Sequence, residues 1–538
     1  MSKPASSHSS NSEALPSGYA LGVTSVLTLT LKAMFILLCI AVLSLLAATR
    51  LFHPLEGDGA LFLTAAKMLD EGAVLYVDFW DVKQPGIFYF FWAAGRLFGF
   101  SMEAVHLLEF AYWAAMGGLM AVLLRPFLAR PWLAAVAPLA FLGTYYGYAP
   151  DAYHAQVEII ASGPLFLSAI LLAGAAGNSS EGSNWRIVLA GVFGAFVVLL
   201  KLVLAPILIA FFIVHIALRL RERVGVSVVM RDAALVSVGG LAVLLVVASA
   251  LYLQGALEGG LEATFVIGPE WAFSAQEAPL YRLMSGAISF FLSAVVWAGF
   301  AIIGLSCAWS PKRLPLTLQC VAWIAAALVC ILIQRFSWWP YHWQLFYLPG
   351  ALLAMLGADY ALDWLERRAI LDESTKVAVA IVALFPILGI YMQIGAERLL
   401  LIRAHKTEIA RGDYDALRAA VSGPYSDALD VVGALPESGR SGTIYVMGDP
   451  LVYVIAGKEQ AVPVNGWALE FFSTRSWERL EHELRDAKPE SIFLATYYED
   501  LLDTSATAIR DLLDSNYHVG SETQFGDWYL LGQVRGDE

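Results

Sequence analysis

Charged residues are scarce in this chain, and cysteines are scarcer. Lys, Arg, Asp and Glu make up 15% of the 538 residues, hydrophobic residues make up 58%, and the mean hydropathy is +0.64. Soluble domains carry about 25% charged residues, so this composition indicates a membrane protein. The 4 cysteines all lie in apolar runs, the last at Cys330. Their placement excludes a disulfide scaffold and a zinc site of cysteine type.

An excess of basic residues is also absent. The net charge is −13, and the stretch from Glu397 onward contributes most of it, because 24 acidic residues face 13 Lys and Arg there, a difference of −11. This balance argues against nucleic acid as a partner. No internal repeat is visible, which disfavours a transporter built from inverted repeats.

Long apolar runs dominate the first 400 residues or so. A bilayer crossing needs roughly 20 apolar residues, and eleven runs approach or exceed that length. Residues 1–30 are expected to form a disordered cytoplasmic leader. The first run lacks a signal-peptide cleavage site, so we expect it to remain as a span. The predicted spans are 31–52, 104–124, 132–148, 159–176, 187–200, 202–220, 233–253, 287–309, 314–333, 342–365 and 377–394.

A short aromatic segment, Ile87–Phe98, decides the sidedness of everything that follows it. If this segment stays on the outer side as a shallow helix, all four basic clusters face the cytoplasm, as the positive-inside rule requires. We therefore predict eleven spans, a cytoplasmic N-terminus and an external C-terminal domain. The clusters are Arg125 and Arg130; Arg219, Arg221, Arg223 and Arg231; Lys312 and Arg313; and Arg367 and Arg368.

Residues 396–538 have the pattern of a small soluble α/β domain. A helical pattern over Glu397–Ala420 opens it, and amphipathic helices, one over Trp477–Asp486, alternate with strand-like runs at 443–447, 491–495 and 528–533. Gly448-Asp449-Pro450 follows the first run and indicates a turn before it indicates a site. No catalytic motif is recognisable in this region.

The first external segment, 51–103, places acids, aromatics and lysines beside the first span. Asp58 lies between two glycines before an amphipathic stretch, where it can cap a helix, act as a catalytic carboxylate, or do both. Asp81 and Lys83 precede Gln84-Pro85. A lone interfacial lysine usually extends toward the lipid headgroups, but a lysine beside aspartates can also hold a lipid phosphate.

Three later features fall on the same predicted face. Asp151 lies at the mouth of a span, as an ordinary loop acid or as a second acid that orients an acceptor or shares a metal ion with Asp58. Lys201 interrupts an apolar run and needs an anion or access to water. An aromatic belt carries Arg335 and His342 at its ends; membrane anchoring explains its Trp and Tyr residues, and the arginine can grip a phosphate.

Together these stretches resemble the GT-C glycosyltransferases, in particular the protein O-mannosyltransferase-like and lipid A aminoarabinose transferase-like enzymes of bacteria. The likeness covers about 31–365. It is carried by Asp58, by Tyr-x-Asp…Asp-x-Lys-x-Pro from Tyr76 to Pro85, by Lys-x-x-x-x-Pro from Lys201 to Pro206, and by the pattern Trp339–Pro349. The family usually has two prolines where this chain has Gln84-Pro85. The resemblance implies a mainly α polytopic membrane protein, GT-C type, with external amphipathic helices and a small C-terminal α/β domain.

The resemblance also implies an activity. A sugar would move, with inversion, from a polyprenyl-phosphate-linked donor to a periplasmic glycan, lipid or protein acceptor at the bacterial inner membrane, among membrane lipids. Residues 31–395 would form the catalytic domain and residues 396–538 a periplasmic domain. Whether a divalent metal ion takes part, held by Asp58 and Asp151, is left open by the resemblance. The implied roles are general base for Asp58, its assistant for Asp151, phosphate binding for Lys83, Lys201, Arg335 and His342, and support for Asp81, Tyr76 and Tyr341.

Two other functions fit parts of the pattern. A transporter or flippase for polyprenyl-linked lipid or polysaccharide would use the same cations, but it is expected to carry charge at mid-span in broken helices. Here the charge lies at predicted external span ends. An assembly protein with an inert membrane part and an acidic recruiting tail would leave Lys201 and the Asp58–Lys83 segment without a purpose.

Overall fold

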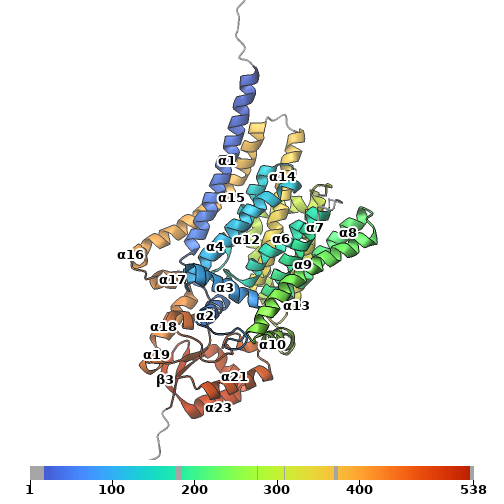
Figure 1. Cartoon of the computed structure of the whole chain (residues 1–538). Coiled ribbons are helices and arrows are strands. Elements are labelled where there is room, and N and C mark those ends of the chain that lie inside the picture. Colours follow the sequence, from blue (N-terminus) through green and yellow to red (C-terminus); the bar gives the residue numbers. More distant parts are fainter. Residues whose placement is uncertain (1–16, 177–183, 276, 308, 369–372, 533–538) are drawn as a thin grey trace, which may run out of the picture.

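The computed structural model describes residues 17–176, 184–275, 277–307, 309–368 and 373–532. A long helical bundle occupies most of this part of the chain, and a small domain from the C-terminal residues lies at one end of it (Figure 1). The N-terminal end of α1 lies at the opposite end. The first sixteen residues of the expected leader lie outside the described residues, whereas 17–30, expected to be disordered, belong to α1.

The described residues contain 9 helices long and apolar enough to cross a membrane. Two shorter apolar helices, α5 (Ala137–Tyr148) and α7 (Asn184–Leu200), coincide with the remaining two predicted spans. The expected span 132–148 is divided, because Pro131–Ala135 forms a 3₁₀ turn before α5. The nine are α1 (Ser17–Arg50), α4 (Met102–Leu123), α6 (Val157–Ala176), α8 (Ala205–Arg221), α9 (Val226–Leu253), α12 (Leu280–Cys307), α13 (Leu314–Ile333), α14 (Tyr347–Arg368) and α15 (Glu373–Ala404).

Two helix pairs in the bundle approach closely at glycines. Gly191 of α7 faces Gly239 of α9, and Gly304 of α12 faces Gly357 of α14; a Cβ at any of the four would collide with a carbonyl oxygen of the facing helix. Small residues permit this backbone approach, which is how membrane helices gain packing energy without a hydrophobic driving force between them. The bundle therefore has fixed helix pairs that hold the loops at its ends.

Ion pairs connect three of the predicted cytoplasmic loops. Arg313 and Arg130 both bind Asp363, and the Nζ of Lys312 donates to the Leu128 carbonyl at 2.6 Å. Asp359 is fully buried and accepts from Arg313 and from the backbone amides of Ala129 and Arg130. Carboxylates on α14 thus pair with Arg130 and Arg313, two of the cations that are predicted to face the cytoplasm.

Short helices lie between the bundle and the C-terminal domain (Figure 1). They are α2 (Asp58–Asp70), α3 (Pro85–Phe98), α10 (Leu257–Glu262), a π turn at Ala263–Ile267, and α11 (Gly268–Ser274). The 14 residues of α3 span only about 21 Å, less than the ~30 Å hydrocarbon core. Gly99 ends α3 with φ 97°, a conformation open to glycine. This length agrees with the expectation that the segment 87–98 does not cross.

The C-terminal domain contains a four-stranded sheet in the order β1-β2-β4-β3. β1 and β2 are parallel, and the other two pairs are antiparallel. The sequence predicts all but β3, whose largely exposed polar pattern hides it as an edge strand. The strands are β1 (Ile444–Met447), β2 (Ser491–Ala495), β3 (Tyr517–Thr523) and β4 (Gly526–Leu531).

Helices cover this sheet and connect it to the bundle. α15 continues unbroken past residue 395, the expected domain boundary, because Arg398 ties it to the bundle by donating to the carbonyls of Tyr146 and Gly147. The expected helix 397–420 is consequently divided among three helices. The helices after α15 are α16 (Lys406–Ile409), α17 (Asp415–Val421), α18 (Gly423–Gly433), α19 (Glu437–Ser441), α20 (Leu451–Ala456), α21 (Thr474–Ala487), α22 (Glu499–Ser505) and α23 (Thr507–Asn516).

Candidate active site

Asp58 is the first residue of α2, and its carboxylate is held by residues from distant parts of the chain. Its side chain is 14% exposed. Oδ1 accepts a hydrogen bond from the indole Nε1 of Trp467 at 2.9 Å, and Oδ2 lies 3.5 Å from the Tyr341 hydroxyl. No side chain caps the helix, whose N-cap residue is Gly57. The carboxylate therefore benefits from the positive end of the helix while facing outward from it.

Lys83 lies between two acids. Its Nζ is 3.4 Å from Asp58 Oδ1 and 3.6 Å from Asp81 Oδ1. Burial alone would lower the pKa of Lys83, but the charges of Asp58 and Asp81 outweigh it and raise the pKa. The ammonium is thus kept charged at neutral pH, next to a carboxylate that is 14% exposed.

A strained turn fixes the backbone around this lysine. Tyr76 has a φ of 68°, which is uncommon for a residue with a side chain. Its hydroxyl donates to the Lys83 carbonyl at 2.8 Å, and Gly259 and Gly260 of α10 pack against it. Asp81 Oδ1 accepts from the Lys83 amide at 2.8 Å. The Tyr76 side chain therefore holds the backbone of Lys83 in place through the hydrogen bond to its carbonyl oxygen.

A second lysine–carboxylate ion pair lies beside the first. Lys201 follows α7, and its Nζ lies 2.5 Å from Oε1 of Glu158, whose side chain is 1% exposed. His342 Nε2 is 3.6 Å from the same oxygen. His342 is within electrostatic range of both Lys201 and Asp58, and Gln84 accepts a hydrogen bond from the Leu202 amide at 3.0 Å. The two lysine pairs therefore belong to one polar cluster.

An apolar cavity of about 500 Å³ opens next to this cluster. It begins at Pro85 and Gly86, directly after Lys83-Gln84, and runs between α3, α4, α6 and α7 with Val247 of α9 at its side. Gly86 packs so closely on the Leu199 carbonyl that a Cβ would collide with it. The cavity is suited to a hydrocarbon chain whose head lies at Lys83.

The C-terminal domain adds three residues to the cluster. Besides Trp467, Asn465 donates to Asp81 Oδ2 and to the Trp80 carbonyl, both at 3.1 Å. Asp449, in the turn after β1, lies close to Asp58 and to the Gly57 amide. Burial raises the pKa of Asp449 to about 6; the backbone amides of Leu451 and Gly57 oppose this, and the Asp58 charge adds to it.

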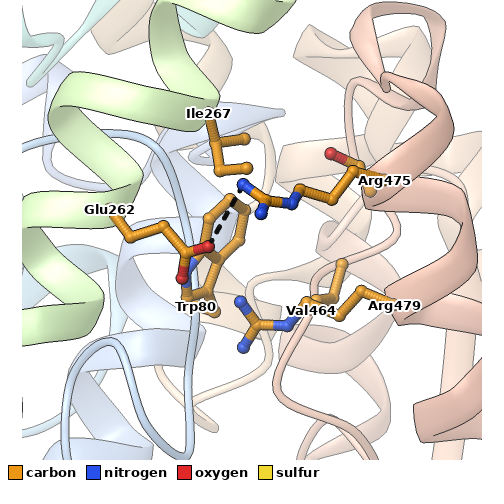
Figure 2. Close-up of a pocket in the computed structure, with 7 residues that line it drawn as sticks. Trp80, Glu262, Ile267, Val464, Arg475 and Arg479 are labelled. Atoms are coloured by element: carbon orange, nitrogen blue, oxygen red, sulfur yellow. Dashed lines mark ion pairs between the residues drawn. The ribbon is translucent and has the colours of Figure 1, made fainter.

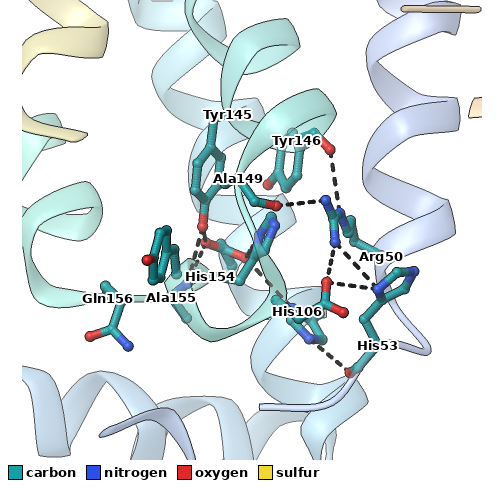
Figure 3. A network of polar contacts seen from close by, with 12 residues as sticks. Arg50, His53, His106, Tyr145, Tyr146, Ala149, His154, Ala155 and Gln156 are labelled. Carbon is teal, nitrogen blue, oxygen red and sulfur yellow. Dashed lines mark hydrogen bonds and ion pairs between the residues drawn. The ribbon is translucent and has the colours of Figure 1, made fainter. Parts of the chain in front are cut away.

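Asp151 belongs to a separate network (Figure 3). It forms an ion pair with Arg50 at the end of α1, and His53 Nδ1 lies 2.8 Å from its Oδ1. Burial would raise the pKa of Asp151, but the His53 hydrogen bond and the charges of His53 and Arg50 lower it to about 2. Arg50 also donates to the Ala149 carbonyl at 2.7 Å. This carboxylate is thus committed to holding α1 against the loop.

The same network continues into the bundle. Glu109 is buried, accepts from the Ala155 amide at 3.0 Å and from Tyr145, and lies 3.6 Å from His106 and 3.9 Å from His154. His106 in turn contacts the His53 carbonyl at 3.2 Å. These contacts anchor the segment that carries Asp151.

Arg335 lies apart from the cluster as well. It pairs with Glu277 at 2.7 Å, and both side chains are more than half exposed. A shared metal ion at Asp58 and Asp151 does not fit these contacts, because Lys83 and an indole N–H face the first carboxylate and Arg50 and His53 face the second. The described residues also contain no group of three or more His, Cys, Asp or Glu placed to hold a metal.

Four residues of the candidate site are not among those predicted from the sequence: Glu158, Asn465, Trp467 and Asp449. A signal existed for Glu158, because an acid at the start of an apolar run needs a cation just as Lys201 needs an anion. The sequence marks Asp449 first as a turn residue and less strongly as part of a site, and nothing in the local pattern marks Asn465 or Trp467.

An apolar helix bundle carries short helices and a small domain over one end (Figure 1), and the lysine–carboxylate cluster lies between them. No family model and no curated protein sequence matches the chain. The structure is similar to that of ArnT from Cupriavidus metallidurans bound to undecaprenyl phosphate, with a TM-score of 0.55 and 14% identity over 93% of this chain and 98% of that one. Its apo state gives a TM-score of 0.55 and 14% identity over 92% and 97%.

A more distant likeness is to the archaeal oligosaccharyltransferase AglB from Archaeoglobus fulgidus, in complex with an inhibitory peptide and a dolichol-phosphate. It has a TM-score of 0.42 and 12% identity over 92% of this chain and 74% of that one, too low to define a fold. The similarity to ArnT extends over nearly the whole of both chains. The predicted GT-C fold is therefore confirmed.

Proposed function

We propose that this protein is an inverting glycosyltransferase that moves a sugar from a polyprenyl-phosphate-linked donor to a periplasmic glycan, lipid or protein acceptor. The observation that carries this proposal is the position of Lys83. It is a charged lysine two residues before Pro85, which lines an apolar cavity of about 500 Å³, and the Asp58 carboxylate is 3.4 Å away. A phosphate on a hydrocarbon chain and a hydroxyl nucleophile are the partners that such a pair suits.

The donor would lie with its polyprenyl chain in the cavity that begins at Pro85 and its phosphate at Lys83. Lys201 and His342 line the other side of the cluster and would add charge or hydrogen bonds to the same phosphate. Because the leaving group is already an anion, most of the catalytic stabilisation must come from cations that neutralise its growing charge. Arg335, paired on the surface with Glu277, has a part in this scheme only if that pair opens.

Asp58 would remove the proton from the attacking acceptor hydroxyl. Its Oδ1 accepts from Trp467 and faces Lys83, whereas Oδ2 has, among the described residues, only the long 3.5 Å contact with Tyr341. Oδ2 is therefore the oxygen that would accept the hydroxyl proton. Direct attack opposite the phosphate inverts the anomeric carbon: the bond from sugar to acceptor oxygen forms while the sugar–phosphate bond breaks. Asp151 would act on positioning, through the Arg50 and His53 network.

The proposal also includes the orientation of the protein in the membrane. With the four basic clusters in the cytoplasm, the cluster of Asp58 and Lys83 and the C-terminal domain face the periplasm of a bacterial inner membrane. Donor lipids assembled in the membrane would then meet acceptors on that side.

A reconstituted system tests the activity. The protein in liposomes is given undecaprenyl phosphate carrying a radiolabelled sugar, with a panel of lipid, glycan and peptide acceptors, and transfer is measured by chromatography. Binding of undecaprenyl phosphate is measured in parallel as a shift in Tm. Lys83→Gln should lose both, whereas Lys67→Gln, a half-exposed lysine on α2 paired with Glu71, should retain both. Equal binding by the two variants would disprove the donor site.

A further inference from the structure

A second cavity, of about 350 Å³, lies between the bundle loops and the C-terminal domain. Its volume is in the range of small-ligand sites. Trp80, Glu262 and Ile267 form one wall, and Val464, Arg475 and Arg479 form the other (Figure 2). It is separate from the apolar cavity beside α3, with which it shares no lining residue.

Two guanidinium groups give this cavity its charge. Arg475 and Arg479 extend from α21 toward Trp80 and Glu262 (Figure 2). Arg475 has one long contact with Glu262, at 3.6 Å, and both side chains are about half exposed. Pairs of this kind are worth about 0–1 kcal/mol, so a better anion can displace Glu262. Arg479 is likewise paired: its Nε lies 2.9 Å from Glu483 Oε1 one turn further along α21, and its side chain is 34% exposed. Both arginines of the lining are therefore held by partly exposed pairs that a bound anion can replace.

Trp80 forms a buried part of the wall of the same cavity, with 2% of its surface exposed. The Arg479 guanidinium lies 4.9 Å from the Trp80 ring centroid, and Trp271 meets the ring edge-on at 6.3 Å. The indole Nε1 of Trp80 is buried and lacks a hydrogen-bond partner among the described residues.

The cavity is joined to the candidate active site through its walls. Trp80 precedes Asp81, one of the two acids around Lys83, and Val464 precedes Asn465, which binds Asp81 at 3.1 Å. Trp80 and Val464 themselves pair as a short β-bridge, with the Trp80 amide donating to the Pro463 carbonyl at 2.8 Å. A molecule extending from the Asp58 side across this bridge would reach the two arginines.

We propose that this cavity is a subsite for an anionic group, a phosphate or a carboxylate, carried by the acceptor glycan at a position other than the reacting hydroxyl. The inference rests on the proposed function, because it takes Asp58 and Lys83 as the reacting centre. The two arginines bind the anion with paired N–H donors when it replaces Glu262 and Glu483 as their partner. The acceptor is therefore an acidic glycan, and the C-terminal domain selects it.

Calorimetry on the full-length protein in detergent tests the subsite. The probes are glucose 6-phosphate, glucuronate and neutral glucose. The anionic sugars should bind more tightly than glucose, and the preferred one of the two identifies the anion. Arg475→Gln/Arg479→Gln should weaken that binding about tenfold or more, since each charged hydrogen bond is worth about 1.5–3 kcal/mol. Arg485→Gln is the matched control, because Arg485 is on the same helix, half exposed and paired with Glu481.

The subsite is refuted if neither anionic sugar binds the wild-type protein, or if the double arginine variant binds as well as the control. Lys83→Gln should retain anionic-sugar binding, which separates the subsite from the donor site. In the opposite direction, the double arginine variant should retain the Tm shift with undecaprenyl phosphate. A wild-type protein that binds no anionic sugar but keeps the Tm shift with undecaprenyl phosphate therefore counts against the subsite alone. A Tm shift with undecaprenyl phosphate that persists in Lys83→Gln counts against the proposed function.

Discussion

Removing the indole donor from Asp58 is predicted to slow sugar transfer. Trp467→Phe deletes the 2.9 Å hydrogen bond to Oδ1 and keeps an aromatic ring at this position. A hydrogen bond to a charged group is worth about 1.5–3 kcal/mol. With 1.36 kcal/mol per tenfold change in rate, kcat/KM should fall about 10- to 150-fold. The loss arises because the carboxylate is no longer held in one orientation.

The assay is transfer from the radiolabelled lipid-linked donor in liposomes, with undecaprenyl phosphate binding measured on the same preparation. Binding should change little, because Lys83 is untouched. Trp271→Phe is the matched control: it deletes an indole donor at the same domain interface, 2.9 Å from the neutral Ser476 hydroxyl. Full activity in Trp467→Phe, or an equal loss in the control, would refute the role of the indole in orienting Asp58.

Three further predictions concern the surrounding charges. Lys201→Gln leaves Glu158, 1% exposed, without its cation and should cost about 3–5 kcal/mol of stability, seen as a lower Tm; Lys201→Gln/Glu158→Gln should recover most of it, and no recovery would contradict the pairing. The pKa of Asp449 is raised from 3.8 to about 6 in the folded state. Through this group the folded protein loses stability as the pH rises from about 4 to 6, and the loss is constant above that pH. Asp449→Asn should therefore raise Tm relative to wild type more at pH 7 than at pH 4.5, and a pH-independent difference would argue against it. Asp151→Asn weakens the pair with Arg50 and should lower Tm while reducing transfer per folded molecule far less than substitution of Asp58; an equal loss of transfer would mean that Asp151 acts at the reaction itself.

Local sequence patterns were sufficient to predict many of the helices and strands and several residues of the candidate site. Apolar run lengths predicted the span helices, and short strand-like runs predicted three of the four strands. Asp58, Asp81, Lys83 and Lys201 stood out because charge beside apolar runs is costly. The structure brings these four together with Tyr76, Tyr341 and His342.

The remaining site residues depend on contacts between distant parts of the chain. Trp467 is 409 residues from Asp58, and Asn465 is 384 from Asp81. The bridge between Trp80 and Val464 that joins them is a pairing of two irregular segments, and neither segment has a strand pattern to predict it. Asp151 and Arg335 were grouped with the site by their predicted face alone, and their actual partners, Arg50 and Glu277, decide their surroundings.

The most direct measurement is sugar transfer by Asp58→Asn in liposomes with the lipid-linked donor. This change removes the base and keeps the shape, so transfer should fall by about 10²–10⁴-fold. Tm and undecaprenyl phosphate binding should stay near wild-type values, because Lys83 and the apolar cavity are intact. Transfer at the wild-type rate by this variant would contradict the assignment of Asp58 as the base.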